Sequence, residues 1–154
     1  MSISPRIREY LDNQEIPYQL VHHRYSETAR GCAEAAHIPL SRMVKAVILR
    51  DDEGFIMALV PADKSVDINA INLRTNRLLS TATQKDVNLI FRDCTKGAVP
   101  GIGQAYNLRI IWDDRILDEP DCYLEAGSHE DLIYLARKEL SALVKDREHG
   151  LICH

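Results

Sequence analysis

The fold is decided by the stretch VKAVILRDDEGFIMALV, residues 44–60. Two apolar runs, Val44–Leu49 and Phe55–Val60, are joined by three acidic residues and Gly54, which is the composition of a β-hairpin with a glycine bulge. In the first strand, alternation places Lys45 on one face with Val47 and Leu49, although both faces of the strand are apolar. This lysine either lies near the end of its strand and reaches water, or it points into a pocket that needs a cation.

On the N-terminal side of the hairpin, the sequence predicts two helices with a strand between them. The pair Ser4-Pro5 is typical of a helix start, and this helix should end near Asn13. Residues 18–23 alternate as in a short strand. Ser26 is the expected cap of the second helix, which should end before Pro39.

On the C-terminal side, short helices and strands alternate. Asp67 is expected to cap one helix, and the spacing of Thr83 and Asp86 predicts a capping box for another. Short strands are expected over Leu78–Ala82 and Leu108–Trp112.

The last third of the chain is expected to continue in the same way. A strand over Cys122–Ala126 is followed by Ser128 and Asp131, whose spacing predicts a capping box that opens a further helix. Another helical turn is expected over 140–144, and the tail over 146–154 should be loosely ordered.

Helices and strands are thus interspersed around at least one hairpin. We predict an α+β (mixed α/β) fold, with a mixed, mostly antiparallel sheet or pseudo-barrel flanked by helices. At 154 residues the chain has room for a single domain, 1–154, with its core over about 18–144.

Composition excludes several classes of function. The net charge of −4 argues against a protein that coats long nucleic acid, although basic residues concentrate in the middle of the chain, as a local basic face or as an ordinary solvated surface. The four cysteines are widely separated and are expected to be apolar fillers, so we expect no metal and no cofactor. With no long apolar stretch and no signal-peptide pattern, a cytoplasmic protein without a membrane partner is expected.

The segment GAVPGIG, residues 97–103, holds three of the 7 glycines and one of the 6 prolines. Such a segment forms a stiff loop whose backbone N–H groups can hold an anion or an oxyanion. A tight connection before the next strand fits the same pattern.

His129 lies at the predicted start of the helix opened by Ser128. A neutral imidazole there could contact a hydroxyl or an ester oxygen of a ligand, or it could simply face solvent. The chain has no G-x-S-x-G, dinucleotide or Walker motif. Lys45, the glycine loop and His129 together could hydrolyse a reactive ester with water as the nucleophile.

At these residues the sequence resembles the YbaK/ProX family, the free-standing relatives of the editing domain of bacterial prolyl-tRNA synthetases. The resemblance spans residues 18–144 and rests on four motifs in order. They are Val44-Lys45-Ala46, Val60-Pro61-Ala62-Asp63, the segment 97–103, and Glu125-Ala126-Gly127-Ser128-His129-Glu130.

The resemblance implies hydrolysis of a mischarged aminoacyl-tRNA in trans, with Lys45, Gly101 and His129 as catalytic candidates. It further implies a set of substrate-binding positions: Gly97, Pro100, Ile102, Gly103, Gly127 and Ser128. The partners implied are the acceptor end of tRNA, bound weakly and in a salt-sensitive manner, and an aminoacyl-tRNA synthetase. The alternative is a non-catalytic binding module of the same fold that acts through a protein or small-ligand partner.

Overall fold

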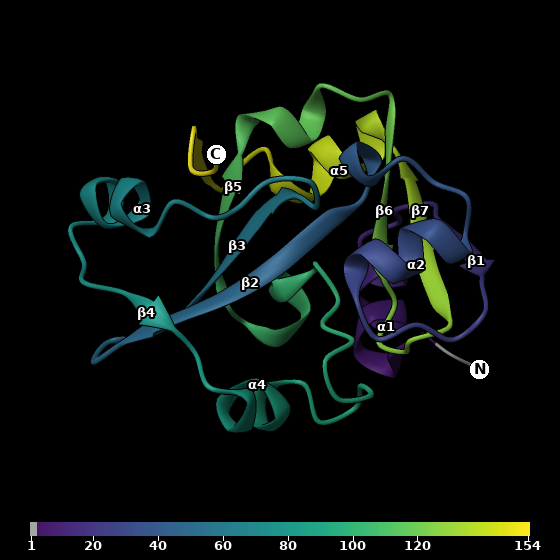
Figure 1. Cartoon of the computed structure of the whole chain (residues 1–154), viewed down its shortest axis with the longest axis horizontal. Coiled ribbons are helices and arrows are strands. Elements are labelled where there is room, and N and C mark those ends of the chain that lie inside the picture. Colours follow the sequence, from purple (N-terminus) through teal and green to yellow (C-terminus); the bar gives the residue numbers. More distant parts are fainter. Residues whose placement is uncertain (1–2) are drawn as a thin grey trace.

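The computed structural model describes residues 3–154, in which two β-sheets are covered by helices (Figure 1). The larger sheet has five strands, and its centre is the predicted hairpin, whose strands pair from Val44 opposite Pro61 to Asp51 opposite Gly54. Its strand order is β4 (Ser80–Thr81), β2 (Val44–Asp51), β3 (Gly54–Pro61), β5 (Arg109–Asp113) and β8 (Glu148–Gly150). The β3–β5 and β5–β8 pairs are parallel and the other pairs are antiparallel.

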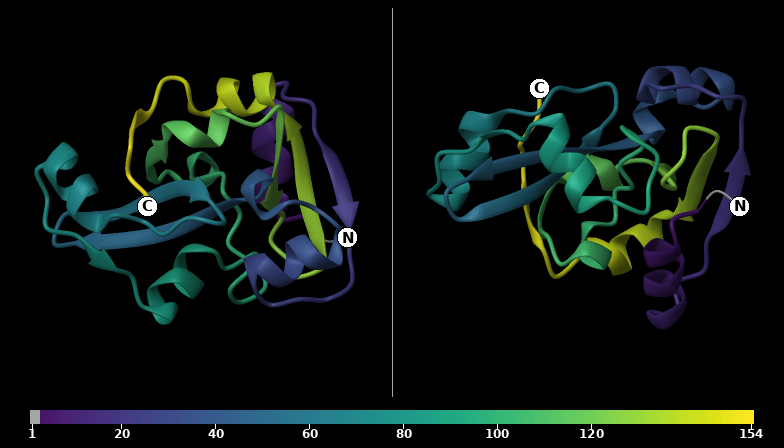
Figure 2. Two further views of the ribbon diagram at one scale, coloured as in Figure 1. Left: turned by 45° about the horizontal axis from the view of Figure 1, so that its top comes forward. Right: turned by 90° about the horizontal axis from the view of Figure 1, so that it is seen from below.

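The smaller sheet is antiparallel, with the order β1 (Gln19–His22), β7 (Asp131–Ala136) and β6 (Asp121–Glu125). A single parallel bridge between Met43 and Tyr123 links it to the start of β2. From there the hairpin extends away from the three-stranded sheet (Figure 2). The α+β class is confirmed, and the expected mixed sheet is divided into two sheets rather than closed into a barrel.

Apart from the last one, the helices begin where side-chain caps satisfy free backbone N–H groups. They are α1 (Pro5–Asn13), α2 (Ala29–Ala35), α3 (Ile68–Thr75), α4 (Gln84–Ile90) and α5 (Arg137–Val144), with short 3-10 turns over 40–42, 103–106 and 114–117. The predicted caps Ser4 and Asp67 and the predicted Thr83–Asp86 capping box are confirmed. The cap of α2 is Thr28 rather than Ser26, because the Thr28 side chain accepts the N–H of Gly31.

The main core lies between the two sheets. It joins Leu59 of β3 and Leu124 of β6 to α1 and α5, and all of these apolar side chains are buried. Cys32, Cys122 and Cys153 are buried as free thiols, as expected for apolar fillers, and Cys94 is half-buried. Over residues 3–154, no helix is both long enough and apolar enough to cross a membrane.

The prediction of a helix after Ser128 is wrong, since Asp131–Ala136 forms the central strand β7 of the smaller sheet. The Ser128 hydroxyl does interact with Asp131, but it donates to the carboxylate at 3.2 Å and accepts the N–H of Glu130, which closes a turn. Pairing with a strand on each side decides the structure of this segment, because it satisfies the backbone groups of β7 on both edges.

The prediction that the tail over 146–154 is loosely ordered is also wrong. Residues 148–150 form β8 beside β5, and Ile152 and Cys153 are buried. The carboxylate of Asp113, itself fully buried, accepts the N–H of Ile152 at 2.8 Å and the thiol of Cys153 at 3.0 Å. Hydrogen bonds to a distant strand therefore hold the end of the described chain in place.

Candidate active site

Two loops meet at the candidate site: the segment that follows α4 and the turn between β6 and β7. The N–H of Thr95 donates to the carbonyl of Gly127 at 2.8 Å. One residue further along the first loop and two along the second, Nε2 of His129 donates to the carbonyl of Lys96 at 2.6 Å. These two bonds fix the turn that carries His129 against the glycine-rich segment.

The imidazole of His129 is held in place by this contact. The side chain is only 4% exposed, and Tyr25 lies edge-on to it with ring centroids 5.5 Å apart. Because a carbonyl can only accept, Nε2 carries a proton, and in the neutral tautomer Nδ1 is the acceptor. Within residues 3–154 this buried Nδ1 has no hydrogen-bond partner. The ring therefore offers an acceptor to a water or a hydroxyl.

A hollow of about 290 Å³ opens beside this histidine, lined by Glu27, Gln84, Lys96, Gly97 and His129. Gly97 has φ of +82°, and a Cβ atom placed on it would lie 3.6 Å from Cε1 of His129. The bare backbone of Gly97 and the imidazole thus share one wall. The volume is near the lower end for small-molecule sites.

The rest of the glycine-rich segment packs into the core instead of lining that hollow. Pro100, Gly101, Ile102 and Gly103 are buried. A Cβ on Gly101 would meet the side chains of Leu124 at 2.9 Å and Leu59 at 3.4 Å. Here glycine permits close packing.

Several N–H groups of this segment, those of Val99 and Gly101 among them, nevertheless stay free. The amides of Val99 and Gly101 donate to no acceptor within the described part of the chain. Amides without an acceptor are rare away from water, since each one loses a hydrogen bond to solvent. They can serve as donors to a ligand oxygen.

Lys45 does not line the hollow at His129. It stands opposite Val60 in the hairpin, and its half-buried side chain makes no ion pair or hydrogen bond with any described residue. Gly101 contacts Leu59, which stands opposite Ala46 and so lies on the other face of the hairpin. The three catalytic candidates are therefore distributed around the junction of the sheets rather than gathered in one hollow.

Sequence reasoning missed Glu125, the last residue of β6. Met43 and Tyr123 bridge the two sheets, and two residues further along their strands Lys45 and Glu125 follow on the same side. Burial raises the pKa of Glu125 to about 8, and its carboxylate accepts a hydrogen bond from the Cys32 thiol at 3.9 Å. A largely buried carboxyl in a strand next to core residues gave no separate signal in the sequence.

The buried His23 was also missed, because the alternation over residues 18–23 does not distinguish it from its neighbours. His23 is 4% exposed, and its Nδ1 donates to the Arg24 carbonyl at 2.6 Å. Its Nε2 is buried without a partner among residues 3–154. Its backbone N–H donates to the carbonyl of Glu130, which ties it to the turn that holds His129.

The comparison with protein families decides what this arrangement belongs to. The family model described as "Aminoacyl-tRNA editing domain" matches residues 23–143, which is most of the chain. The chain belongs to this family. The resemblance inferred from the four sequence motifs is thereby confirmed, and Lys45, the segment 97–103 and His129 all lie within the editing domain. No curated protein matches the chain in sequence.

Solved structures share the fold of this editing domain. A protein proposed to be a trans-editing enzyme for prolyl-tRNA synthetase aligns with a TM-score of 0.85 at 22% identity, over 99% of both chains. The hypothetical protein APE2540 aligns with a TM-score of 0.85 at 18% identity, over 97% of this chain and 99% of its own. A scaffold used for computational epitope grafting aligns with a TM-score of 0.84 at 20% identity, over 98% and 96% of the two chains. At these identities the likeness establishes the fold.

Proposed function

We propose that this editing domain hydrolyses the ester bond of a mischarged aminoacyl-tRNA in trans, with water as the nucleophile. The protein would act on tRNAs already released from a synthetase, in the cytoplasm. In the reaction, the water oxygen attacks the ester carbonyl carbon, the bond to the terminal ribose oxygen breaks, and that oxygen takes up a proton.

The observation that carries the proposal is the free Nδ1 of His129. An imidazole whose Nε2 is held by the Lys96 carbonyl presents, in its neutral tautomer, a fixed acceptor beside the open backbone of Gly97. Such an acceptor can orient the attacking water or the ribose hydroxyl that positions this water. Little conformational entropy is lost on binding, because the ring is already held in place.

Lys45 and the free amides would balance the negative charge of the substrate and of the oxyanion. The ammonium of Lys45, unpaired among the described residues, would bind the terminal phosphate or the ester oxygen. The N–H groups of Val99 and Gly101 would donate to the oxyanion that develops on the carbonyl oxygen. For Lys45 and the two amides to act on the same substrate, the acceptor end of the tRNA must span the junction between the two sheets.

For the amino acid, we propose a small side chain such as alanine on a prolyl tRNA. The sequence at Gly127-Ser128-His129 resembles the family members that remove alanine more than those that remove cysteine. A solved structure with the same fold is proposed to edit for prolyl-tRNA synthetase, which supports this choice of tRNA.

A non-catalytic binding module is the second candidate, and the burial of residues 100–103 favours it. A segment that packs into the core offers few atoms to a substrate. The absence of Lys45 from the lining of the hollow at His129 points the same way.

Deacylation of a panel of mischarged tRNAs distinguishes the two candidates. The purified protein should release at least one amino acid faster than buffer does, with alanine on a prolyl tRNA the first substrate to try. His129→Gln, which keeps a donor near the Lys96 carbonyl but removes the Nδ1 acceptor, should slow hydrolysis by about 10²-fold. Lys45→Met should raise KM or lower kcat, whereas Lys138→Ala, an exposed change on α5, should leave the rate unaltered.

Two outcomes would refute the deacylase. One is that no aminoacyl-tRNA in the panel is hydrolysed above the buffer rate. The other is that both Lys45→Met and His129→Gln turn over substrate at the wild-type rate while remaining folded by circular dichroism. Stable capture of a protein without tRNA-dependent turnover would favour the binding module.

A further inference from the structure

Three arginines surround two adjoining hollows that lie between α1 and the segment after α4. The larger hollow has a volume of about 550 Å³ and is lined by Arg8, Arg92 and Asp93, among others. The smaller, about 320 Å³, is lined by Arg6, Arg92, Asp93 and Tyr106. Because Arg92 and Asp93 line both hollows, the two hollows form one depression, which we call the arginine groove.

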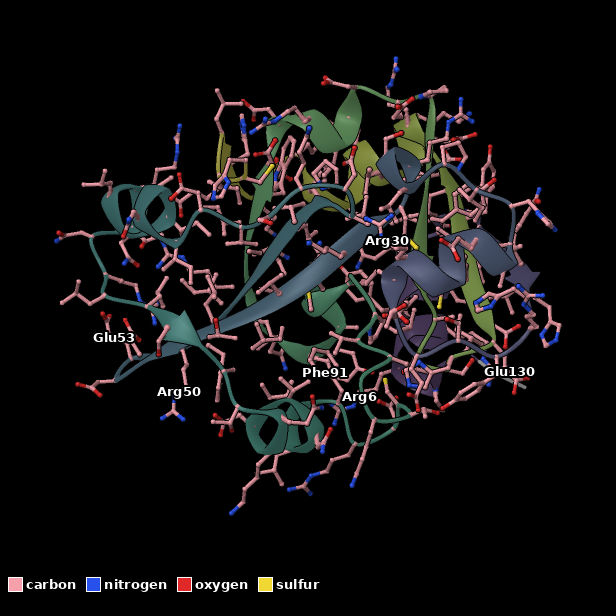
Figure 3. All side chains as sticks on the ribbon, viewed as in Figure 1. Arg6, Arg30, Arg50, Glu53, Phe91 and Glu130 are labelled. Atoms are coloured by element: carbon pink, nitrogen blue, oxygen red, sulfur yellow. The ribbon has the colours of Figure 1, made fainter. Side chains whose placement is uncertain are left out.

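The guanidinium groups of this groove are free to bind a ligand. Arg6, Arg8 and Arg92 are exposed, and none forms an ion pair with a described residue. The guanidinium carbon of Arg6 lies 5.4 Å from the centre of the Tyr106 ring, which orients it without neutralising it (Figure 3 shows Arg6 beside Phe91).

One carboxylate, Asp93, lies within the groove, and local donors already occupy it. It accepts the Ser4 hydroxyl at 2.5 Å, the Tyr106 hydroxyl at 2.6 Å and the N–H of Arg6 at 3.3 Å. Burial acts to raise its pKa, but the hydrogen bonds from Ser4 and Tyr106 outweigh this effect and lower it, so the group stays ionised. Its role is to join α1 to the segment after α4, and the groove keeps a net positive charge.

A more voluminous hollow elsewhere on the protein provides a contrast. It measures about 950 Å³ and lies at the far end of the hairpin, where Figure 3 labels Arg50 and Glu53. Arg50 pairs with Asp86 at 2.8 Å, and Arg77 pairs with Asp51. Its arginines are neutralised and three acidic residues line it, so it does not suit a polyanion.

The arginine groove also leads directly to the candidate active site. Thr95 and Gly127 line the larger hollow and are hydrogen-bonded to each other at 2.8 Å. Their neighbours Lys96, Gly97 and His129 line the hollow at the imidazole. The two hollows therefore lie on either side of the same pair of loops, and Lys96 continues the line of positive charge between them.

From this arrangement we infer that the arginine groove binds backbone phosphates of the RNA whose aminoacylated end reaches His129. The planar, multiply donating guanidinium group matches the geometry of a phosphate. Phosphates bound at Arg8 and Arg92 would fix the strand outside the site and leave the terminal nucleotide beside Gly97. This inference rests on the proposed function, because it assigns the RNA part of the substrate to a surface next to the same site.

The test uses a fluorescently labelled short RNA hairpin with a single-stranded 3′ end. The double variant Arg8→Gln/Arg92→Gln should weaken its binding at least about fivefold at low salt. The slope of log Kd against log salt concentration should fall by about 1–2, one unit for each phosphate that the variant no longer neutralises. The matched control is Lys138→Gln/Lys145→Gln, which removes the same charge from α5, on the other side of the molecule from α4 (Figure 1). This control should bind like the wild type.

A kinetic readout separates this inference from the proposed function. The ratio of kcat/KM for an aminoacylated hairpin to that for an aminoacylated adenosine should fall about fivefold in the arginine variant and stay constant in the lysine control. If the wild type hydrolyses neither ester, the proposed function fails, and the binding titration alone decides the groove. Equal losses in both double variants, or wild-type binding by the arginine variant, would overturn the inference.

Discussion

The imidazole of His129 lies directly against Gly97, with its Cε1 atom 3.6 Å from the position of a Cβ on that glycine. The Lys96 carbonyl, one residue earlier, accepts the proton of Nε2. A residue without a side chain and a buried histidine therefore define the same small surface.

A methyl group at position 97 should impair function more than stability. Gly97→Ala forces an alanine to φ of +82° and places its Cβ against the ring, so we expect at least a tenfold loss in kcat/KM for the aminoacyl ester. Gly54→Ala is the matched control, since Gly54 also has a positive φ, +136°, but faces open space in the hairpin turn. Both variants should lose about 1 kcal/mol of unfolding free energy, measured in urea. Equal kcat/KM values for the two variants would contradict the assignment of Gly97 to the site.

Gly103→Ala should destabilise the fold. The added Cβ would lie 2.7 Å from Cδ1 of Ile110 and 3.0 Å from Sδ of Met57, within a closely packed core. Overpacking of this kind costs about 1–3 kcal/mol, which should appear as a lower urea midpoint with an unchanged m-value. An unchanged midpoint would mean that the core around Met57 adjusts without cost.

Asp113→Asn should lower the free energy of unfolding at neutral pH. Burial acts to raise the pKa of Asp113, but hydrogen bonds from Arg115 and Cys153 lower it to about 2, from 3.8. Because the folded pKa is depressed, the stabilisation is complete above about pH 4 and is lost as the pH falls towards 2. The variant should lose about 2 kcal/mol at pH 7 and show a flatter acid limb in thermal melts. Asp118→Asn, an exposed change nearby, should retain the acid limb of the wild type.

Glu125→Gln should change the pH dependence of stability in the direction opposite to Asp113→Asn. Burial raises the pKa of Glu125 from 4.5 to about 8 in the folded protein. Since the folded state binds the proton more tightly, this stabilisation is complete below about pH 4.5 and is lost as the pH rises through 8. The neutral amide avoids this loss, so the Tm of the variant relative to the wild type should increase between pH 5 and pH 9. The exposed change Glu34→Gln is the control, and a constant difference across this range would exclude an ionisable Glu125.

Features encoded within a few residues could be predicted from the sequence. The hairpin follows from two apolar runs around an acidic turn, and Ser4, Asp67 and Thr83 cap helices as their local patterns indicate. These features depend on hydrogen bonds between near neighbours, which is why a short window of sequence is sufficient.

Features that depend on distant partners could not be predicted in this way. Ser128 and Asp131 carry a capping-box spacing, yet β7 forms because β1 and β6 pair with both of its edges. The tail is ordered by the buried Asp113, about forty residues earlier. The sequence pointed to Lys45, Gly101 and His129, but their separation across the junction of two sheets is a property of the tertiary fold.

Gly101 touches Leu59 of the five-stranded sheet and Leu124 of the three-stranded sheet, so the absence of a side chain there sets how closely the two sheets approach. Lys45 is carried by the first sheet, and the turn with His129 by the second. A larger residue at position 101 would move these two groups apart without touching a ligand. Evolution could therefore retune which esters this domain accepts by altering the spacing between its halves, with every residue that contacts the substrate left unchanged.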